Sequence, residues 1–238
     1  AHVPLRAPTT LLDSKLAELF GMAHFLPAHQ GRACEHIIAS TLVKPGSIVP
    51  MNFHFTTTKA HIVRNGGAVV ELLIDEGLKT TSEFPFKGDL DLGKLRQVID
   101  EHGARNIPFV RLEAGTNLIG GQPFSLRNAR EVAATCRAHG ILTVLDASLL
   151  QDNLYFMRQR EAECKGMSIR EITRALADEM DISPGNLYYH FHNKDEILES
   201  IFADFKREIE DILAVPTRRS ADVEDIWLFL HLLFEQIW

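Results

Sequence analysis

The chain has 238 residues, of which 45% are hydrophobic and 24% charged, enough for one large or two modest domains with a buried core. This composition excludes a disordered chain, a collagen-like repeat and a coiled-coil rod as descriptions of the whole. The net charge of −7 argues against a protein that coats nucleic acid or an anionic membrane through bulk charge, although a local basic or polar reading surface stays open.

The cysteines and the apolar runs indicate the cellular compartment in which the protein is expected to reside. Cys34, Cys136 and Cys164 are an odd, widely spaced set, which suggests neither a disulfide framework nor a CxxC metal site. No uninterrupted apolar run approaches the roughly 18 residues of a spanning helix, and the opening AHVPLRAPTT lacks the apolar core of a signal peptide. We therefore expect a soluble protein of the reducing cytoplasm, with no metal site and no membrane contact.

Charge divides the chain into two parts. Residues 168–238 hold 7 Lys and Arg against 15 Asp and Glu, net −8, whereas residues 1–167 hold 18 against 17, net +1. We predict a domain boundary there.

Residues 1–167 alternate short β-type runs with helical periods. The β-type runs are IVPMNFHF near residue 50, AVVELLID at 68–75, IPFVRLEA at 107–114 and ILTVLDAS at 141–148. Amphipathic stretches lie between them, among them LDLGKLRQVIDEHG at 90–103 and SLRNAREVAATCRAHG at 125–140. This βαβ order predicts an α/β fold in which helices cover the faces of a parallel sheet.

Four polar groups of residues lie where these strands end or helices begin. Gly31 and Arg32 in PAHQGRACEHII precede a helical run, so helix N–H groups and a guanidinium can hold a phosphate. NFHFTTTKAH places an aromatic beside three hydroxyls, EAGTNLIGGQPFS combines Asn117 with a Gly-Gly pair, and VLDAS ends a strand in Asp146. Taken singly, these residues are more simply explained as turn glycines, a core aromatic and a helix cap.

Taken in order, these motifs resemble the tryptophanase and tyrosine phenol-lyase family of pyridoxal-phosphate enzymes. The resemblance covers roughly residues 12–173 and includes LAELFGMAHFLPAHQGRACEHII, FKGDLDLGKL, TNLIGGQP and NLYFMRQREAECKGMSIREIT. It implies part of the large domain of fold type I, pyridoxal phosphate as cofactor, an aromatic amino acid as substrate and, if the chain folds, a homo-oligomer. The implied cofactor residues are Gln30, Gly31 and Arg32 at the phosphate, Phe55 stacked on the ring with Thr56 nearby, Asn117 at the phenolic oxygen and Asp146 at the ring nitrogen.

Two departures from the family pattern bear on activity. Leu149 stands where well-known members carry an arginine three residues after the aspartate. In the family, the lysine that forms the Schiff base lies in a serine-x-x-lysine segment after the aspartate strand. The resemblance stops near Thr173, before that segment, and neither Lys165 nor Lys194 is a credible substitute. The family's substrate-carboxylate arginine is missing as well. We therefore expect no covalent attachment of the cofactor and assign no catalytic residue.

Residues 168–238 have no credible strand and are predicted to be all α. In IREITRALADEM, Ile169, Ile172, Leu176 and Met180 share one helix face, and Ser183 with Pro184 supplies a cap and first residue for a second helix. A helix, a short turn and a second helix have the geometry of a helix-turn-helix.

The SPGNLYYHFHNKDEIL stretch resembles the DNA-binding domain of TetR-family regulators. By this resemblance Leu187 and Phe191 belong to the core, and double-stranded DNA is the partner. The implied DNA contacts are Thr173, Arg174, Pro184, Gly185, Asn186, Tyr188, Tyr189, His190 and Lys194. The alternative is that the aromatic residues only pack a helical bundle.

The two resemblances meet within SIREITRALAD, near residues 168–177. Three hypotheses stay open: a chimera of two truncated families with neither activity intact, a DNA-binding regulator that lacks the helix normally preceding IREITRALA, and a lyase that lacks its lysine. For the larger part we also predict that Gly31, Asn117 and Asp146 face a common crevice, with Arg32 and Asp146 on the same side of the sheet.

Overall fold

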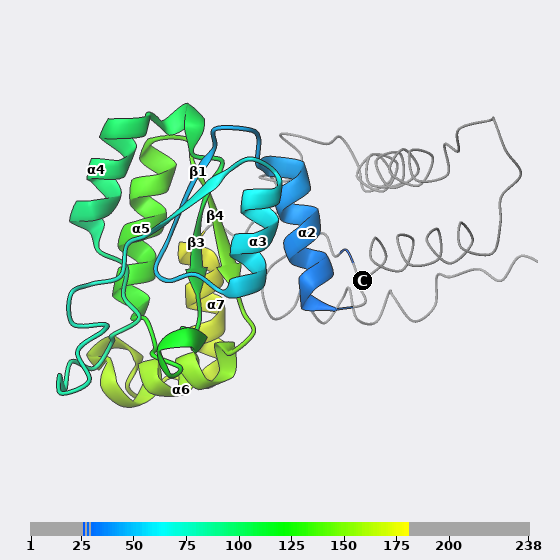
Figure 1. Ribbon diagram of the computed structural model, residues 1–238. Helices are drawn as coiled ribbons and strands as arrows, with labels where there is room; N and C mark the ends of the chain where they lie inside the picture. Colours follow the sequence, from blue (N-terminus) through cyan, green and yellow to red (C-terminus); the bar gives the residue numbers. More distant parts are fainter. Residues whose placement is uncertain (1–25, 27, 29, 181–238) are drawn as a thin grey trace, which may run out of the picture. The chain divides into compact units, whose positions relative to one another are not determined.

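A computed structural model describes residues 26, 28 and 30–180 of the chain (Figure 1). The chain divides into two compact units, Ala1–Asn186 and Leu187–Trp238, and every described residue belongs to the first. Within the described residues, no helix is long and apolar enough to cross a membrane. The predicted DNA contacts from Pro184 onward lie outside the described residues.

The unit is built on a four-stranded parallel sheet, as the βαβ order predicts. Its strands run in the order β2, β1, β3, β4, and all pairs are parallel. They are β1 (Ile48–Met51), β2 (Ala68–Glu71), β3 (Phe109–Glu113) and β4 (Leu142–Asp146). Each of the four β-type runs therefore forms a strand, and the prediction of an α/β parallel sheet is confirmed.

Helices cover both faces of this sheet. Figure 1 shows α2 (Gly31–Leu42) and α3 (Thr56–Arg64) on one side, and α4 (Leu92–His102) and α5 (Leu126–Ala138) on the other. α6 (Leu150–Arg160) and α7 (Ile169–Glu179) follow β4. Three short 3₁₀ helices lie at Ala104–Asn106, Asn117–Ile119 and Ala162–Cys164.

Local sequence signals explain where several helices begin. The side chain of Asp91 accepts from the backbone N–H of Lys94 at the start of α4, and Ser125 caps α5 in the same way. Ser168 and Glu171 form a reciprocal capping box at the start of α7. Polar caps placed before apolar periodic runs are what allow such helices to be found from sequence.

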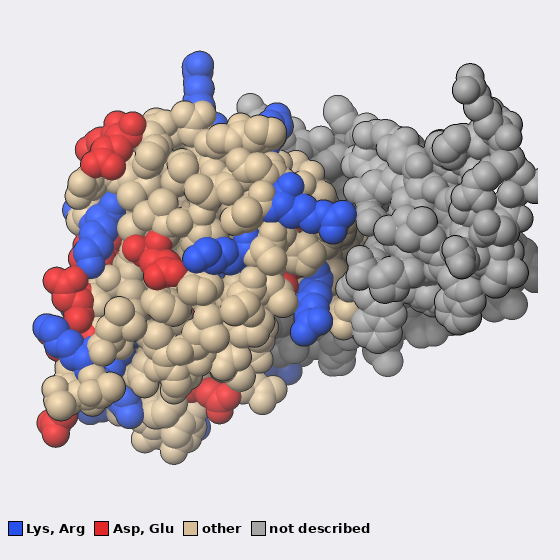
Figure 2. Space-filling view, in the orientation of Figure 1, with Lys and Arg blue, Asp and Glu red and all other residues tan. Residues whose placement is uncertain are grey.

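The two faces of the sheet carry two apolar cores. The larger packs α4, α5, α6 and α7 against Val110 and Leu112 of β3. The smaller packs α2 and α3 against β1 and Phe109. Because alternate residues of a strand point to opposite faces, β3 contributes to both cores. On the face seen in Figure 2, Lys and Arg are interspersed with Asp and Glu.

Candidate functional site

A pocket of about 530 Å³ lies at the carboxyl end of the sheet. From β1 the chain moves to β2 on one side and then returns to β3 and β4 on the other, so the strand order reverses between β1 and β3. In open parallel sheets, ligands bind beyond the carboxyl ends of the strands at such a switch point. The volume is in the range of small-molecule and cofactor sites.

Strand alternation places two charged residues of β3 in this pocket. Val110 and Leu112 point into the larger core, so Arg111 and Glu113 point to the opposite face with Phe109. The side chains of Arg111 and Glu113 are only 3% and 4% exposed. Charged groups buried this deeply need partners.

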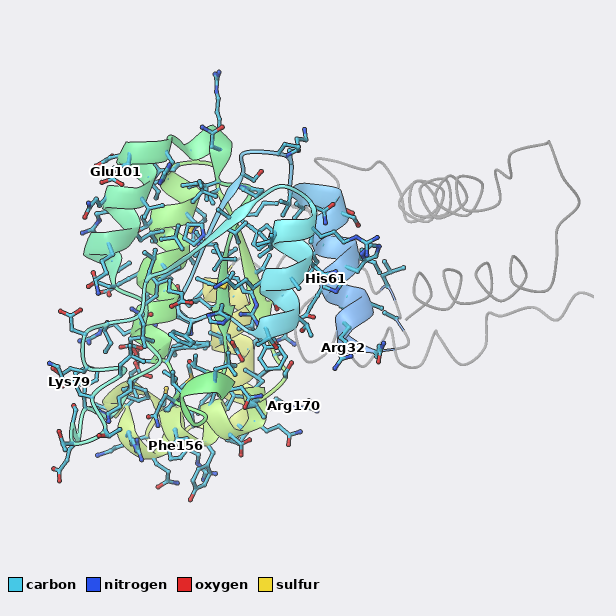
Figure 3. All side chains as sticks on the ribbon, viewed as in Figure 1. Arg32, His61, Lys79, Glu101, Phe156 and Arg170 are labelled. Atoms are coloured by element: carbon cyan, nitrogen blue, oxygen red, sulfur yellow. The ribbon has the colours of Figure 1, made fainter. Side chains whose placement is uncertain are left out.

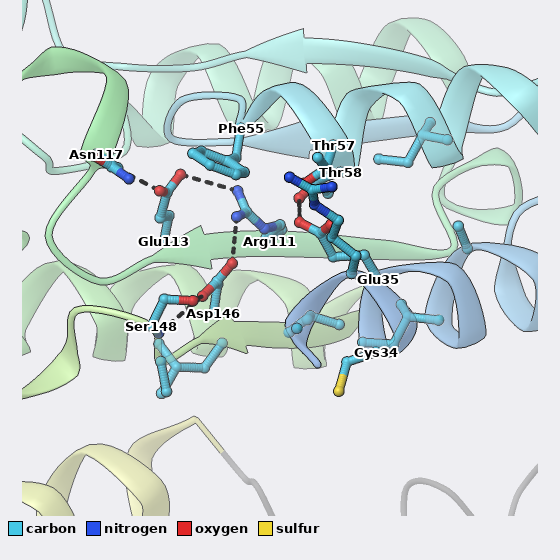
Figure 4. A pocket seen from close by; sticks show the side chains of 18 of the residues that line it. Cys34, Glu35, Phe55, Thr57, Thr58, Arg111, Glu113, Asn117, Asp146 and Ser148 are labelled. Atoms are coloured by element: carbon cyan, nitrogen blue, oxygen red, sulfur yellow. Dashed lines mark hydrogen bonds and ion pairs between the residues drawn. The ribbon is translucent and has the colours of Figure 1, made fainter. Parts of the chain in front are cut away.

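Arg111 links the carboxylates of β3 and β4. Its Nη2 lies 2.6 Å from Oδ2 of Asp146, and its Nη1 lies 3.3 Å from Oε2 of Glu113 and 3.4 Å from the carbonyl oxygen of Phe53. The other oxygen of Asp146 accepts from the backbone N–H and the hydroxyl of Ser148, at 2.9 and 2.5 Å. Figure 4 shows the guanidinium between the two carboxylates, with Phe55 beside it.

The pKa values of Glu113 and Asp146 shift in opposite directions. Burial raises the pKa of Glu113, and the nearby Arg111 charge and the Asn117 backbone N–H only partly oppose that effect. Burial also acts to raise the pKa of Asp146, but Arg111 and the two hydrogen bonds from Ser148 outweigh it and hold that pKa below its ordinary value. Asp146 is therefore the acid that stays ionised more readily.

The opposite end of the pocket holds the start of α2 together with the carboxylate of Glu35. α2 begins at Gly31, and its first backbone N–H groups have no acceptor inside the helix, as at any helix N-terminus. Arg32 lies in this first turn and is exposed (Figure 3). Beside it, the hydroxyl of Thr58 donates to Glu35. Two polar atoms of the lining, Oε2 of Glu35 and the hydroxyl of Thr57, are buried and unpaired.

The loop that carries Asn117 is fixed by glycines and by two buried amides. Gly120 and Gly121 have φ of 83° and 72°, which side chains disfavour, so this turn needs both glycines. The side chain of Asn52 bonds the backbone N–H and carbonyl of Glu113, and that of Asn153 accepts from the Gly115 N–H. The backbone that leads into Asn117 is thus held in place.

Of the seven predicted cofactor residues, the structure brings six to this pocket. They are Gln30, Gly31, Arg32, Phe55, Asn117 and Asp146. Thr56 is exposed and absent from the lining; its neighbours Thr57 and Thr58 line the pocket instead. The roles assigned to these side chains remain predictions, but Arg32 and Asp146 do lie on the same side of the sheet.

Two of the predicted DNA contacts are described, and both lie on α7. Thr173 is 7% exposed, and its hydroxyl donates to the carbonyl of Ile169 at 2.8 Å. Arg174 is exposed. The buried face of α7 completes the larger core through Ile172, Leu176 and Met180, as their spacing predicts. In this unit, the side of α7 that carries Thr173 therefore faces protein.

Sequence reasoning missed Arg111 and Glu113, although a signal for them exists. A strand of a parallel sheet is covered on both faces and normally reads as continuously apolar. Two charged residues of opposite sign, two positions apart inside the apolar run IPFVRLEA, therefore indicate a shared polar surface on one face.

The pocket fits pyridoxal phosphate in most respects. Its volume, the helix start with Arg32, the aromatic side chain of Phe55 and the carboxylate of Asp146 match the phosphate, ring and ring nitrogen of that molecule. One difference is that Arg111 pairs with Asp146. No lysine is among the described residues that line the pocket, and no group of three or more potential metal ligands occurs in the described part of the chain.

Comparison with known proteins agrees with this geometry. The family model of beta-eliminating lyases matches residues 7–184, and that of bacterial regulatory proteins of the tetR family matches residues 169–201. The tyrosine phenol-lyase of Pasteurella multocida is 42% identical over 170 residues, which are 71% of this chain and 37% of that enzyme. The tyrosine phenol-lyase of Fusobacterium nucleatum is 42% identical over 165 residues, 69% of this chain and 36% of the enzyme.

The chain thus spans little more than a third of the length of these relatives. Among solved structures, an alanine aminotransferase from Pyrococcus furiosus matches with a TM-score of 0.46 and 14% identity, over 85% of this chain and 59% of that one. This likeness is too low to add to the assignment, which rests on the sequence matches. Because the first family model covers well over half of its residues, the chain belongs to the beta-eliminating lyase family, with pyridoxal phosphate as its cofactor.

Proposed function

We propose that this chain carries the cofactor pocket of a lyase that acts on an aromatic amino acid. The observation that carries the proposal is that one pocket at the sheet's switch point gathers the start of α2, Phe55 and Asp146. The tyrosine phenol-lyases at about 42% identity support the class of substrate.

In this proposal each end of the pocket has its own task. Arg32 and the first N–H groups of α2 bind the phosphate, because a guanidinium and a helix start both favour an anion. Phe55 covers one face of the ring and excludes water from it, and Asn117 donates to the phenolic oxygen. Asp146 lies at the ring nitrogen. When bound, pyridoxal phosphate supplies an electron sink for bond cleavage at the substrate.

Equilibrium binding tests this assignment. Titration of the full chain with pyridoxal phosphate in a calorimeter should show one saturable site. Arg32→Ala should weaken binding by about tenfold or more, because a charge-assisted hydrogen bond contributes roughly 1.5–3 kcal/mol. Arg64→Ala, an exposed arginine of α3 outside the pocket lining, is the matched control and should bind as wild type. If both variants lost the same amount of affinity for pyridoxal phosphate, the assignment of the cofactor to this pocket would be rejected.

Covalent attachment is tested separately. We expect no lysine of this chain to bond to the cofactor, so borohydride treatment of the mixture should leave the intact mass unchanged. A mass gain located at Lys165 or Lys194 would contradict this expectation.

DNA binding is the second candidate function, supported by the tetR-family match over residues 169–201. If the chain binds duplex DNA, Lys194→Ala should weaken binding to all sequences and reduce the salt slope by about one. Asn186→Ala or Tyr188→Ala should instead alter the preference among sites by about 1–3 kcal/mol. A folded chain that shows no salt-dependent binding to any duplex pool would refute this candidate function. If the chain binds neither pyridoxal phosphate nor DNA, the remaining hypothesis is a chimera in which neither activity is intact.

A further inference from the structure

Asp146 is paired with a positively charged side chain, that of Arg111. Nη2 of Arg111 lies 2.6 Å from its Oδ2, while Ser148 donates twice to its Oδ1. Both oxygens of the carboxylate are therefore engaged, one of them by a full positive charge.

Arg111 has further partners in this position. Besides Asp146, its guanidinium is bonded to Glu113 and to the carbonyl of Phe53, and its side chain is 3% exposed. Glu113 is held in turn by the backbone N–H of Asn117, at 3.2 Å from its Oε1. Because the contact to Asp146 is shorter than the contact to Glu113, Asp146 is the main partner of the guanidinium.

A carboxylate paired in this way stabilises a second cation poorly. A protonated ring nitrogen that reached Asp146 would come to within a few ångströms of the Arg111 guanidinium, and the two positive charges would repel in a site with little water. A neutral ring nitrogen meets no such repulsion and can instead accept a hydrogen bond from the guanidinium.

We propose that Arg111 selects the charge state of the ring, so that this pocket binds pyridoxal phosphate with its ring nitrogen unprotonated and discriminates against a ring that is positively charged there. This inference rests on the proposed function, because it requires the ring to lie between Phe55 and Asp146. It assigns to Arg111 a positioning role and leaves the phosphate end unchanged.

Two probes distinguish the charge states. One is pyridoxal phosphate, and the other is its derivative methylated on the ring nitrogen, which carries a fixed positive charge. Wild type should bind the methylated probe at least about tenfold more weakly, a difference of roughly 1.4 kcal/mol. In Arg111→Met/Glu113→Leu, which removes both buried charges of β3 together and leaves Asp146 without a paired cation, the difference should vanish or reverse.

The double variant also controls for the size of the methyl group. If it still rejects the methylated probe as wild type does, size and not Arg111 causes the discrimination, and the inference is wrong. Equal binding of both probes by wild type also overturns it. If wild type binds neither probe, the proposed function fails and the inference with it.

A measurement on wild type alone covers the case in which the double variant does not fold. The nitrogen NMR shift of ring-labelled pyridoxal phosphate differs between a protonated and an unprotonated ring. The bound cofactor should show the unprotonated shift at a pH where the ring nitrogen of the free cofactor is protonated. A protonated shift in the complex would overturn the inference.

Discussion

Arg111 and Glu113 depend on each other, so single and paired replacements should differ in stability. Arg111→Met leaves the carboxylates of Glu113 and Asp146 without their cation and should lower the free energy of unfolding by about 3–5 kcal/mol. Arg111→Met/Glu113→Leu also removes the more buried of these two carboxylates but still leaves Asp146 without its cation, so it should recover only part of that loss. Urea unfolding measures both. A double variant no more stable than the single one would mean that the two side chains do not compensate each other.

Asp89 should make stability depend on pH. It is 5% exposed, and burial raises its pKa from 3.8 to about 7, although hydrogen bonds from the backbone and hydroxyl of Ser125 oppose that rise. In the window between 3.8 and about 7, the folded state binds a proton that the unfolded state has lost. Asp89 therefore contributes stability that is present below its usual pKa and lost as pH rises through about 7.

Asp89→Asn tests this, because asparagine keeps an acceptor for the Ser125 N–H and does not titrate. The free energy of unfolding of wild type relative to Asp89→Asn should fall between about pH 4 and about pH 8. A constant difference across that range would show that Asp89 does not titrate within it.

The three cysteines should differ in reactivity. Cys34 is exposed and lines the pocket, whereas burial raises the pKa of Cys136 to about 12 and that of Cys164 to about 11. Because the thiolate is the reactive form, a maleimide should label Cys34 alone in the folded protein and all three in denaturant. Bound pyridoxal phosphate should slow labelling of Cys34. Mass spectrometry that finds Cys136 labelled at a similar rate would contradict the burial described above.

Among the elements, α7 has the sharpest test because two family models overlap on it. Leu176 is 1% exposed in the larger core, so Leu176→Ala should cost about 2–5 kcal/mol in the unfolding of the α/β unit. Asp178→Ala, on the exposed side of the same helix, should change stability by less than about 0.5 kcal/mol. Similar small effects for both would mean that α7 does not belong to this core.

Elements were predictable from sequence where a local signal exists. The four strands follow apolar runs, and α4, α5 and α7 follow capped amphipathic periods. Strand ends were less predictable: β1 stops at Met51 inside its β-type run, because Asn52 bonds to backbone groups of Gly88 and Glu113, which are distant in sequence. The packing partners of α7 were likewise not encoded in its own periodicity.

The site was predicted in part, and its gaps have physical causes. Motif positions led to Thr56, but α3 begins at that residue, and the turn of the helix brings Thr57 and Thr58 to the pocket instead. The link from Arg111 to Asp146 joins residues 35 apart on neighbouring strands, so it follows from sheet order and register. No single motif contains both.

In the molecule as a whole, we expect pyridoxal phosphate to bind in the pocket at the switch point of the sheet. A crystal structure of the full chain with pyridoxal phosphate tests this most directly. We expect the phosphate at the start of α2 beside Arg32, the ring against Phe55, and the ring nitrogen toward the paired Arg111 and Asp146. Density for the cofactor anywhere else, or an empty pocket at saturating cofactor, would contradict it.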